Sequence, residues 1–257
     1  PTAADFSDMP DGQAVRSAMD RITPETSLGV YVHVPFCEKL CWYCGCATTV
    51  PNGYRRVSGF VDVLMKEIDV WRTHLPAHAD MRHLHFGGGS PNSLNCGDFR
   101  EITNHIKLAF GVGEDIEIDI ELDPRTTTDA FIETLASCGV TRASLGVQTL
   151  SGPVQKAINR IQPRHMATAK LAHLRQNGIR RINMDLMYGL PLQTRDDVRE
   201  AAQYAADVGA DRISLFGYAH VPWFAKHQRA IHDADLPGLE ERFEQARVGH
   251  EVLTAAG

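Results

Sequence analysis

Three cysteines near residue 40 have the residue type and the spacing of metal ligands. Cys37, Cys41 and Cys44 form the pattern C-x3-C-x2-C within one short segment. Three thiolates on one loop can bind three irons of a cubane [4Fe–4S] cluster, whereas clusters that only carry electrons normally have a cysteine on all four irons. The pattern therefore indicates a cluster whose fourth iron is open to another ligand.

An open iron is a coordination site for a bidentate amino-acid group, such as the methionine end of S-adenosylmethionine (SAM). An electron from the cluster can then break a C–S bond of the bound sulfonium and release a 5′-deoxyadenosyl radical. Two other arrangements stay open, because Cys46 follows two residues after Cys44. The four cysteines can form a structural zinc site, or Cys46 can be the fourth ligand of a closed cluster.

The bulk composition is that of an ordinary globular protein. The chain has 257 residues, of which 43% are hydrophobic and 23% charged, and its net charge of −6 argues against general nucleic-acid binding. No apolar run is long enough to span a bilayer, and the first residues lack the features of a secretory signal. We therefore expect a cytoplasmic, reducing environment, where clustered cysteines bind metal. Cys96 and Cys138 are interpreted as structural.

Short aliphatic or β-branched runs alternate with amphipathic helical stretches along the chain. The runs predict strands at 29–35, 82–86, 115–122, 142–147, 181–187 and 212–216, and the stretches predict helices at 57–73, 99–110, 129–138, 166–177 and 197–208. Gly139 and Gly178 mark two helix C-termini. Such units without a hairpin signal predict an α/β fold with a parallel sheet, as a barrel, a partial barrel or an open sheet. In each case the residues that follow the strands meet at one end of the sheet.

The motifs at these strand ends, taken in order, resemble a known family. The cysteine spacing followed by a strand and a glycine triplet resembles the radical SAM superfamily. The sequence around these motifs resembles the oxygen-independent coproporphyrinogen III oxidases (dehydrogenases). The resemblance lies in the segments YVHVPFCEKLCWYCGC, LHFGGGSPNSL, IELDPR, SLGVQT, INR, NMDLMYGLPLQT and FGYAHVP. The resemblance implies a (β/α)6 partial barrel of the TIM type. It also implies an N-terminal segment at 1–28 and a core at 29–257, without the C-terminal helical domain of that family.

The resemblance also implies roles for individual residues. Cys37, Cys41 and Cys44 would hold the cluster, and two SAM molecules would bind beside it. The cluster-bound SAM would contact Tyr31, Gly88 and Glu121, with Tyr31, His33 and Glu121 at the reacting centre. The second SAM would lie against Tyr43, Gly89, Ser90, Gln148, Arg160, Asp185 and Ala219.

The reaction implied by the resemblance is the oxidative decarboxylation of coproporphyrinogen III to protoporphyrinogen IX, with a low-potential electron donor as a second partner. We expect a monomer that binds neither nucleic acid nor membrane. Arg55, Arg56 and Arg125 are candidates for the substrate carboxylates by position only, and a solvated surface arginine is an equally good interpretation. The alternative function is that of the related haem-chaperone branch, which binds and delivers haem.

His83 and His85 alternate on one predicted strand and therefore share one of its faces. Two imidazoles on one face are compatible with a metal site. Because no third ligand lies nearby in the sequence, the two histidines are interpreted as structural.

Overall fold

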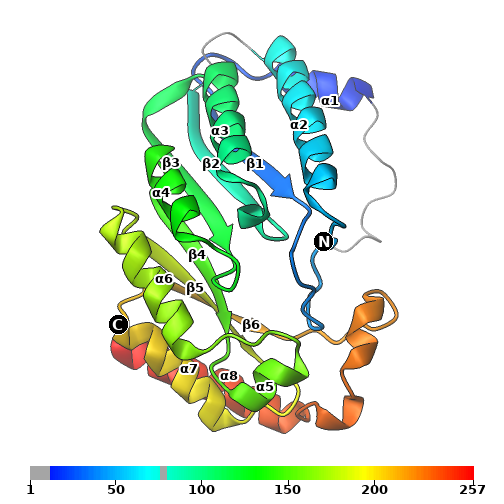
Figure 1. Cartoon of the computed structure of the whole chain (residues 1–257), viewed down its shortest axis with the longest axis vertical. Coiled ribbons are helices and arrows are strands. Elements are labelled where there is room, and N and C mark those ends of the chain that lie inside the picture. The colour runs from blue at the N-terminus through cyan, green and yellow to red at the C-terminus, as the bar shows by residue number, and fades with distance from the viewer. Residues whose placement is uncertain (1–11, 76–79) are drawn as a thin grey trace.

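The computed structural model describes residues 12–75 and 80–257, and its centre is a six-stranded parallel sheet (Figure 1). The strands lie in the order of the sequence: β1 (Ser27–Val34), β2 (Asp80–Gly88), β3 (Val112–Leu122), β4 (Arg142–Gln148), β5 (Arg181–Tyr188) and β6 (Arg212–Gly217). A doubly wound sheet would reverse its strand order near the middle. The unbroken order instead gives the partial barrel implied by the family resemblance. Residues 1–11 of the expected N-terminal segment lie outside the described residues.

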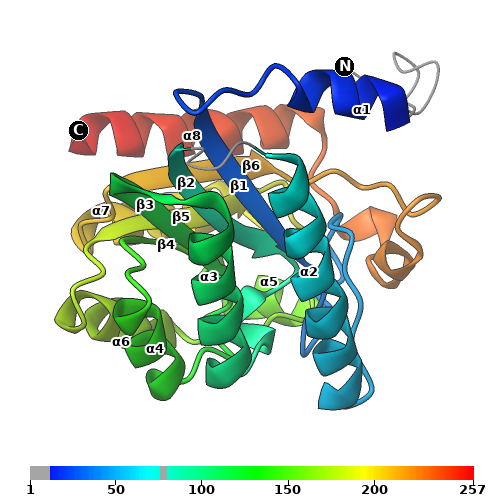
Figure 2. The same ribbon diagram turned by 90° about the horizontal axis from the view of Figure 1, so that it is seen from above.

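Helices cover the outer face of the sheet (Figures 1 and 2). The five predicted helices are present as α2 (Tyr54–His74), α3 (Cys96–Phe110), α4 (Asp129–Ser137), α6 (Arg164–Gln176) and α7 (Arg195–Asp207). Further elements are α1 (Gly12–Met19), α5 (Gly152–Ala157), α8 (Leu239–Ala256), and the 3-10 turns η2 (Pro91–Ser93), η3 (Lys226–Ala230) and η4 (Asp233–Asp235). Among the described residues, no helix is both long and apolar enough to cross a membrane.

Local sequence fixes where the helices begin and end. Thr194 and Asp197 form a capping box at the start of α7, so two otherwise unpaired backbone N–H groups are satisfied. Gly139 and Gly178 follow α4 and α6 with φ angles of 81° and 86°. Only glycine adopts this left-handed conformation freely, which confirms the two helix C-termini predicted from the sequence.

The two faces of the sheet differ in polarity because alternate residues of a strand point to opposite sides. On β3, Ile118 and Ile120 are buried against the helices, and Glu117, Asp119 and Glu121 alternate with them. The main hydrophobic core therefore lies between the sheet and the helices. The inner face of the partial barrel is left free for polar residues.

The last strand, β6, is an edge of the sheet, because the strand order places it at one end with β5 as its single neighbour. Apolar side chains on and near this edge are exposed, among them Phe216, Trp223, Phe224 and Phe243. α8 packs beside α7 at the same end of the sheet (Figure 1).

Candidate active site

The cysteine loop (residues 35–49) leaves β1 and folds back on itself, so both of its ends are fixed. The backbone N–H of Cys37 donates to the carbonyl oxygen of Thr49 at 3.0 Å, and the N–H of Thr49 donates to that of Pro35 at 2.9 Å. In the middle of the loop, the N–H of Trp42 donates to the carbonyl oxygen of Ile158 at 3.0 Å. The loop is thus tied to its own strand and to the segment that follows α5.

The sulfur atoms of two cluster cysteines have polar neighbours. Cys37 Sγ shares a hydrogen bond of 3.1 Å with the hydroxyl of Thr48, and the hydroxyl of Ser90 donates to it at 3.7 Å. Burial raises the pKa of the Cys37 thiol. The sulfur of Cys44 accepts from the backbone N–H of Cys46 at 3.4 Å, and a side-chain hydrogen bond with Cys44 lowers the pKa of the Cys46 thiol to about 7.

The third cluster cysteine, Cys41, is buried and faces two guanidinium groups. Arg125 Nη2 and Arg160 Nη1 donate to its sulfur at 3.2 and 3.4 Å. Both arginines pair with Asp123, at 2.6 and 3.1 Å, and the three charged side chains are only 7 to 8% exposed. Although burial alone would raise the pKa of Asp123, Arg160 and Arg125 hold it below its usual value.

These surroundings fit an iron–sulfur cluster. The three cysteines of the motif are free thiols on one loop and line one cavity. Hydroxyl, amide and guanidinium donors point at their sulfur atoms, and such donors stabilise the thiolate form that binds iron. Cys37, Cys41 and Cys44 are therefore the residues that would hold the cluster. Cys46 lines the same cavity but is exposed.

The glycine segment at the end of β2 (residues 87–90) packs so closely on β1 and the cysteine loop that Gly88 and Gly89 leave no room for a side chain. A Cβ atom added to Gly89 would lie 2.5 Å from the carbonyl oxygen of Phe36. At Gly88, φ is 111°, and an added Cβ would lie 2.8 Å from the imidazole of His33. The backbone N–H of Ser90 donates to the Phe36 carbonyl oxygen at 2.7 Å. A bare backbone is thus presented beside the cysteines.

Glu121 lies at the carboxyl end of β3 and faces this segment. Its Oε2 accepts from the backbone N–H of Gly88 at 3.2 Å, and its Oε1 lies 3.4 Å from Nε2 of His85. The ring of Tyr31 stacks on His85 with ring centroids 5.4 Å apart, and its hydroxyl is 3.0 Å from Nδ1 of His33. The residues expected at the reacting centre thus form one contiguous group.

A cavity of about 660 Å³ brings most of the predicted residues together. Its lining includes Cys37, Cys41, Tyr43, Cys44, Gly88, Gly89, Ser90, Glu121, Gln148, Arg160, Asp185 and Ala219. Tyr31 and His33 lie beside the cavity and are not part of its lining. Arg55 and Arg56 are exposed at the start of α2, whereas Arg125 is buried, so the surface interpretation of Arg125 is wrong.

Two of the residues expected at the second SAM, Gln148 and Asp185, come from β4 and β5. Gln148 is buried with φ at 66°, a conformation that residues other than glycine rarely adopt and that is common at functional sites. The carboxylate of Asp185 accepts from the hydroxyl of Ser144 and from Nδ2 of Asn183, each at 2.8 Å. Burial raises the pKa of Asp185.

Two further residues that the sequence did not indicate hold the cysteine loop from the other side. Gln228 is buried, and its Nε2 donates to the carbonyl oxygens of Tyr43 at 3.0 Å and Ala219 at 3.2 Å. Nε2 of His227 donates to the carbonyl oxygen of Cys44 at 2.7 Å. Both lie in the short turn η3, where too few residues occur for a periodic pattern.

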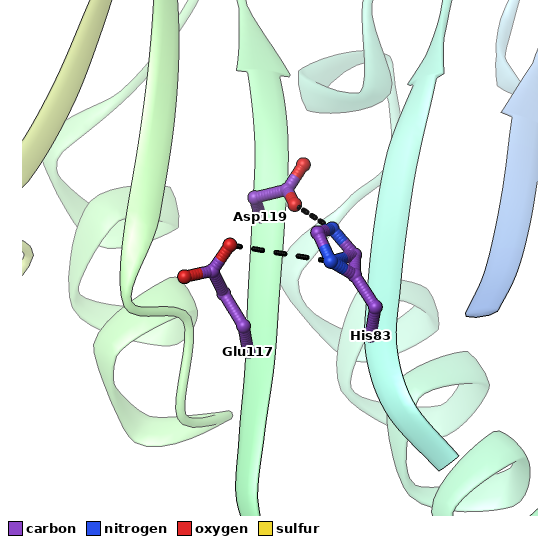
Figure 3. Close-up of side chains that lie close together, drawn as sticks. All are labelled: His83, Glu117 and Asp119. Atoms are coloured by element: carbon purple, nitrogen blue, oxygen red, sulfur yellow. Dashed lines mark hydrogen bonds and ion pairs between the residues drawn. The ribbon is translucent and has the colours of Figure 1, made fainter. Parts of the chain in front are cut away.

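His83 and His85 are closer to possible metal ligands than the sequence indicated. The register between β2 and β3 pairs His83 with Glu117 and His85 with Asp119. Figure 3 shows His83 between the carboxylates of Glu117 and Asp119. Asp119 also contacts His85. The further ligands come from the neighbouring strand, which the spacing of residues along β2 did not reveal.

These carboxylates already have partners in the protein. Glu117 pairs with Arg142 at 3.2 Å and with Arg181 at 2.6 Å, and Asp119 contacts both imidazoles. The group is therefore a row of paired charges along the inner face of the sheet, and its members do not need a metal ion to be satisfied.

The fold and the cysteine loop define the class of the protein. The sequence profile of the radical SAM superfamily matches residues 31–205, and the chain belongs to this superfamily.

Individual proteins of this superfamily are similar to the chain over its whole length. Proteins named oxygen-independent coproporphyrinogen III oxidase are 39% identical in Bradyrhizobium diazoefficiens and 37% identical in Cereibacter sphaeroides, over the whole chain in both cases. The solved structure of coproporphyrinogen III oxidase from Escherichia coli, described as a radical SAM enzyme, matches the whole chain with a TM-score of 0.94 and 36% identity. The chain covers 57% of the two sequences and 59% of the solved chain, so it spans less than two thirds of these relatives.

Proposed function

We propose that this chain is the core of an enzyme that oxidatively decarboxylates coproporphyrinogen III to protoporphyrinogen IX. The observation that carries the proposal is the single cavity that holds the three cluster cysteines, the glycine segment and the polar ends of β3, β4 and β5. The similarity to coproporphyrinogen III oxidases extends over the whole chain and supports the choice of substrate.

Each part of the cavity has a task in this proposal. A cluster held by Cys37, Cys41 and Cys44 would supply the electron that cleaves SAM. The carboxylate of Glu121 would bind the cationic amino group of the first SAM, because it lies beside the bare backbone at Gly88.

A second SAM would bind at the ends of the neighbouring strands. The carboxylate of Asp185 suits the ribose hydroxyls, and the guanidinium of Arg160 suits a carboxylate. Gln148 and Tyr43 line the same part of the cavity. Both molecules would then lie within one cavity beside the cysteine loop.

The chemical step removes one hydrogen atom from the β-carbon of a propionate side chain of the substrate. A cluster held by Cys37, Cys41 and Cys44, with SAM bound, would supply the 5′-deoxyadenosyl group that takes up this hydrogen. The substrate radical then loses CO2 and passes one electron to an acceptor, which leaves a vinyl group. Two such rounds convert two propionates. The protein positions the reacting carbon and excludes competing reactions.

The test is an anaerobic assay of the reconstituted chain. The protein is loaded with iron and sulfide, reduced, and supplied with SAM and coproporphyrinogen III, and the products are separated by chromatography. We expect protoporphyrinogen IX and 5′-deoxyadenosine with the unchanged chain and with Cys96→Ala. Neither product should form with Cys41→Ala.

Other outcomes would contradict the proposal in distinct ways. Cleavage of SAM without a change in the porphyrinogen would support the radical chemistry and contradict the proposed substrate. Binding of one haem per chain without turnover would instead favour the haem-chaperone branch.

A further inference from the structure

Of the three cluster cysteines, Cys41 differs from the others in the charge of its hydrogen-bond donors. Among the described residues, the sulfur atoms of Cys37 and Cys44 meet only neutral donors, namely hydroxyls and a backbone N–H. The sulfur of Cys41 meets the guanidinium groups of Arg125 and Arg160. Positive charge is therefore concentrated at one corner of the site.

Arg125 is held in a fixed orientation. Its Nε donates to both carboxylate oxygens of Asp123, at 3.0 and 3.1 Å, and its Nη2 donates to Oδ2 at 2.6 Å. Its Nη1 donates to the carbonyl oxygen of Asn159 at 3.4 Å. A planar guanidinium fixed at both ends loses little further freedom when it makes one more hydrogen bond. The contact with Cys41 is thus built into the folded chain.

This set of contacts leaves Arg125 poorly placed to bind a substrate carboxylate. Its donors are directed at Asp123, Asn159 and Cys41, and its side chain is 7% exposed. Arg160 differs, because it is also one of the residues expected to contact the second SAM. Arg125 contacts Cys41 and is not one of those residues.

We propose that Arg125 is a positioning residue that fixes Cys41 and raises the reduction potential of the iron–sulfur cluster. The inference rests on the cluster of the proposed function and not on its substrate. Hydrogen bonds to cluster sulfur atoms and nearby charge set the potential of such clusters. One-electron reduction adds a negative charge, so adjacent cations stabilise the reduced state.

The charges around Cys41 support an increase in the reduction potential. The two guanidinium groups and the single carboxylate of Asp123 leave one net positive charge beside the sulfur. All three side chains are almost completely buried, and buried charges are screened by salt much less than exposed ones. Without Arg125, the pair formed by Asp123 and Arg160 would be neutral.

The test is a reductive titration of the reconstituted chain, followed by electron paramagnetic resonance, without SAM or substrate. We expect Arg125→Gln to keep its iron and to show a midpoint potential more negative than that of the unchanged chain. Arg125→Lys keeps the charge but not the planar fork, so its potential should lie in between. Arg142→Gln removes an arginine at the other end of the same cavity and should leave the potential unchanged.

An unchanged potential in a fully loaded Arg125→Gln protein would overturn the inference. If this variant holds no cluster, Arg125→Lys decides: because it keeps the charge and loses the planar fork, a loaded protein with a more negative potential supports the inference, whereas the potential of the unchanged chain would contradict a role for the guanidinium hydrogen bond to Cys41. An unchanged chain that takes up no cluster would overturn both this inference and the proposed function. A loaded chain without porphyrinogen turnover would affect only the proposed function.

Discussion

At the carboxyl end of the strands, the cavity is bordered by buried charges, whereas most of the polar side chains at the amino end are more accessible to water. Asp123, Arg125 and Arg160 are 7 to 8% exposed. In the row formed by His83, Glu117, Asp119, Arg142 and Arg181, the exposed fractions of the side chains run from 9% for Asp119 and 22% for Glu117 to 44% for His83 and 63% for Arg181. The first group lies in the segments that follow β3 and α5, and the second lies on β2, β3, β4 and β5.

The difference in burial gives the two networks different energetic roles. Exposed ion pairs contribute little because water and salt screen them. Buried charges cost desolvation energy, and removing one partner leaves the others uncompensated. The buried network at the carboxyl end is thus suited to hold the cysteine loop in one geometry. The network at the amino end pairs the polar side chains of the inner face and costs less desolvation energy.

The largest expected effect is the loss of the cluster in Cys41→Ala. Three thiolates are needed for three irons, so this variant should bind little iron, as measured by iron content and visible absorbance after reconstitution. Cys96→Ala, outside the cavity, is the control and should load like the unchanged chain. Equal iron in both variants would show that the cysteine loop is not the cluster site.

The next largest effect is expected for Asp123→Asn. This change leaves two buried guanidinium groups without their carboxylate and should lower the free energy of unfolding by about 3–5 kcal/mol. Urea unfolding of the cluster-free chain, followed by circular dichroism, measures it. Glu117→Gln, the matched change in the exposed network, should cost about 1 kcal/mol or less. Similar losses in both variants would remove the contrast between the two ends.

The contribution of Asp123 to the free energy of unfolding depends on pH. Its pKa lies below the usual value of an aspartate, which is about 3.9 in unfolded chains. Its contribution to stability is therefore present above about pH 3.9 and is lost as the pH falls through the lower pKa of the folded state. The stability of Asp123→Asn should fall less steeply with acid in this window, as measured by urea unfolding at several pH values.

A smaller effect is expected for Glu121→Gln, which keeps the shape of the side chain and removes its charge. A hydrogen bond to a charged group is worth about 1.5–3 kcal/mol, so the affinity for SAM should fall by about 10- to 100-fold. Calorimetry on the cluster-loaded chain measures this affinity. Glu117→Gln makes the same exchange at the amino end, and it should leave the affinity unchanged. An equal fall in both would contradict a direct contact between Glu121 and SAM.

The smallest effect is expected for His83→Asn. The side chain of His83 is 44% exposed, and Asp119 keeps its contact with His85. The free energy of unfolding should change by less than about 1 kcal/mol, and the iron content should not change. A loss of several kcal/mol in the free energy of unfolding would contradict this prediction. Zinc bound by the unchanged chain and not by this variant would show that the row is a metal site.

Much of the fold could be predicted because its signals are local. Each strand and each long helix carries its own periodicity, and Gly139 and Gly178 mark helix ends by their conformation. The cysteine spacing indicated the cluster loop, and the family resemblance supplied most of the other predicted residues that line the cavity. The choice of a partial barrel came from the family resemblance, because alternation within a strand does not fix strand order.

The remaining contacts depend on residues far apart in the sequence. Arg125 meets Cys41 across 84 positions, and Gln228 meets Tyr43 across 185. Neither residue type has a preferred partner that a pattern would reveal. The row around His83 likewise depends on the register between β2 and β3, which sets which side chains face each other.

The edge strand β6 has a practical consequence for handling the chain. An unpaired strand edge offers a row of free N–H and C=O groups to which another molecule can add a strand. The exposed rings of Phe216, Trp223 and Phe224 lie along and beyond this edge and add an apolar surface of the kind that promotes self-association. The apparent molar mass measured by light scattering should therefore rise with protein concentration. The rise should be smaller for Phe216→Lys, because a lysine on an edge disfavours strand addition.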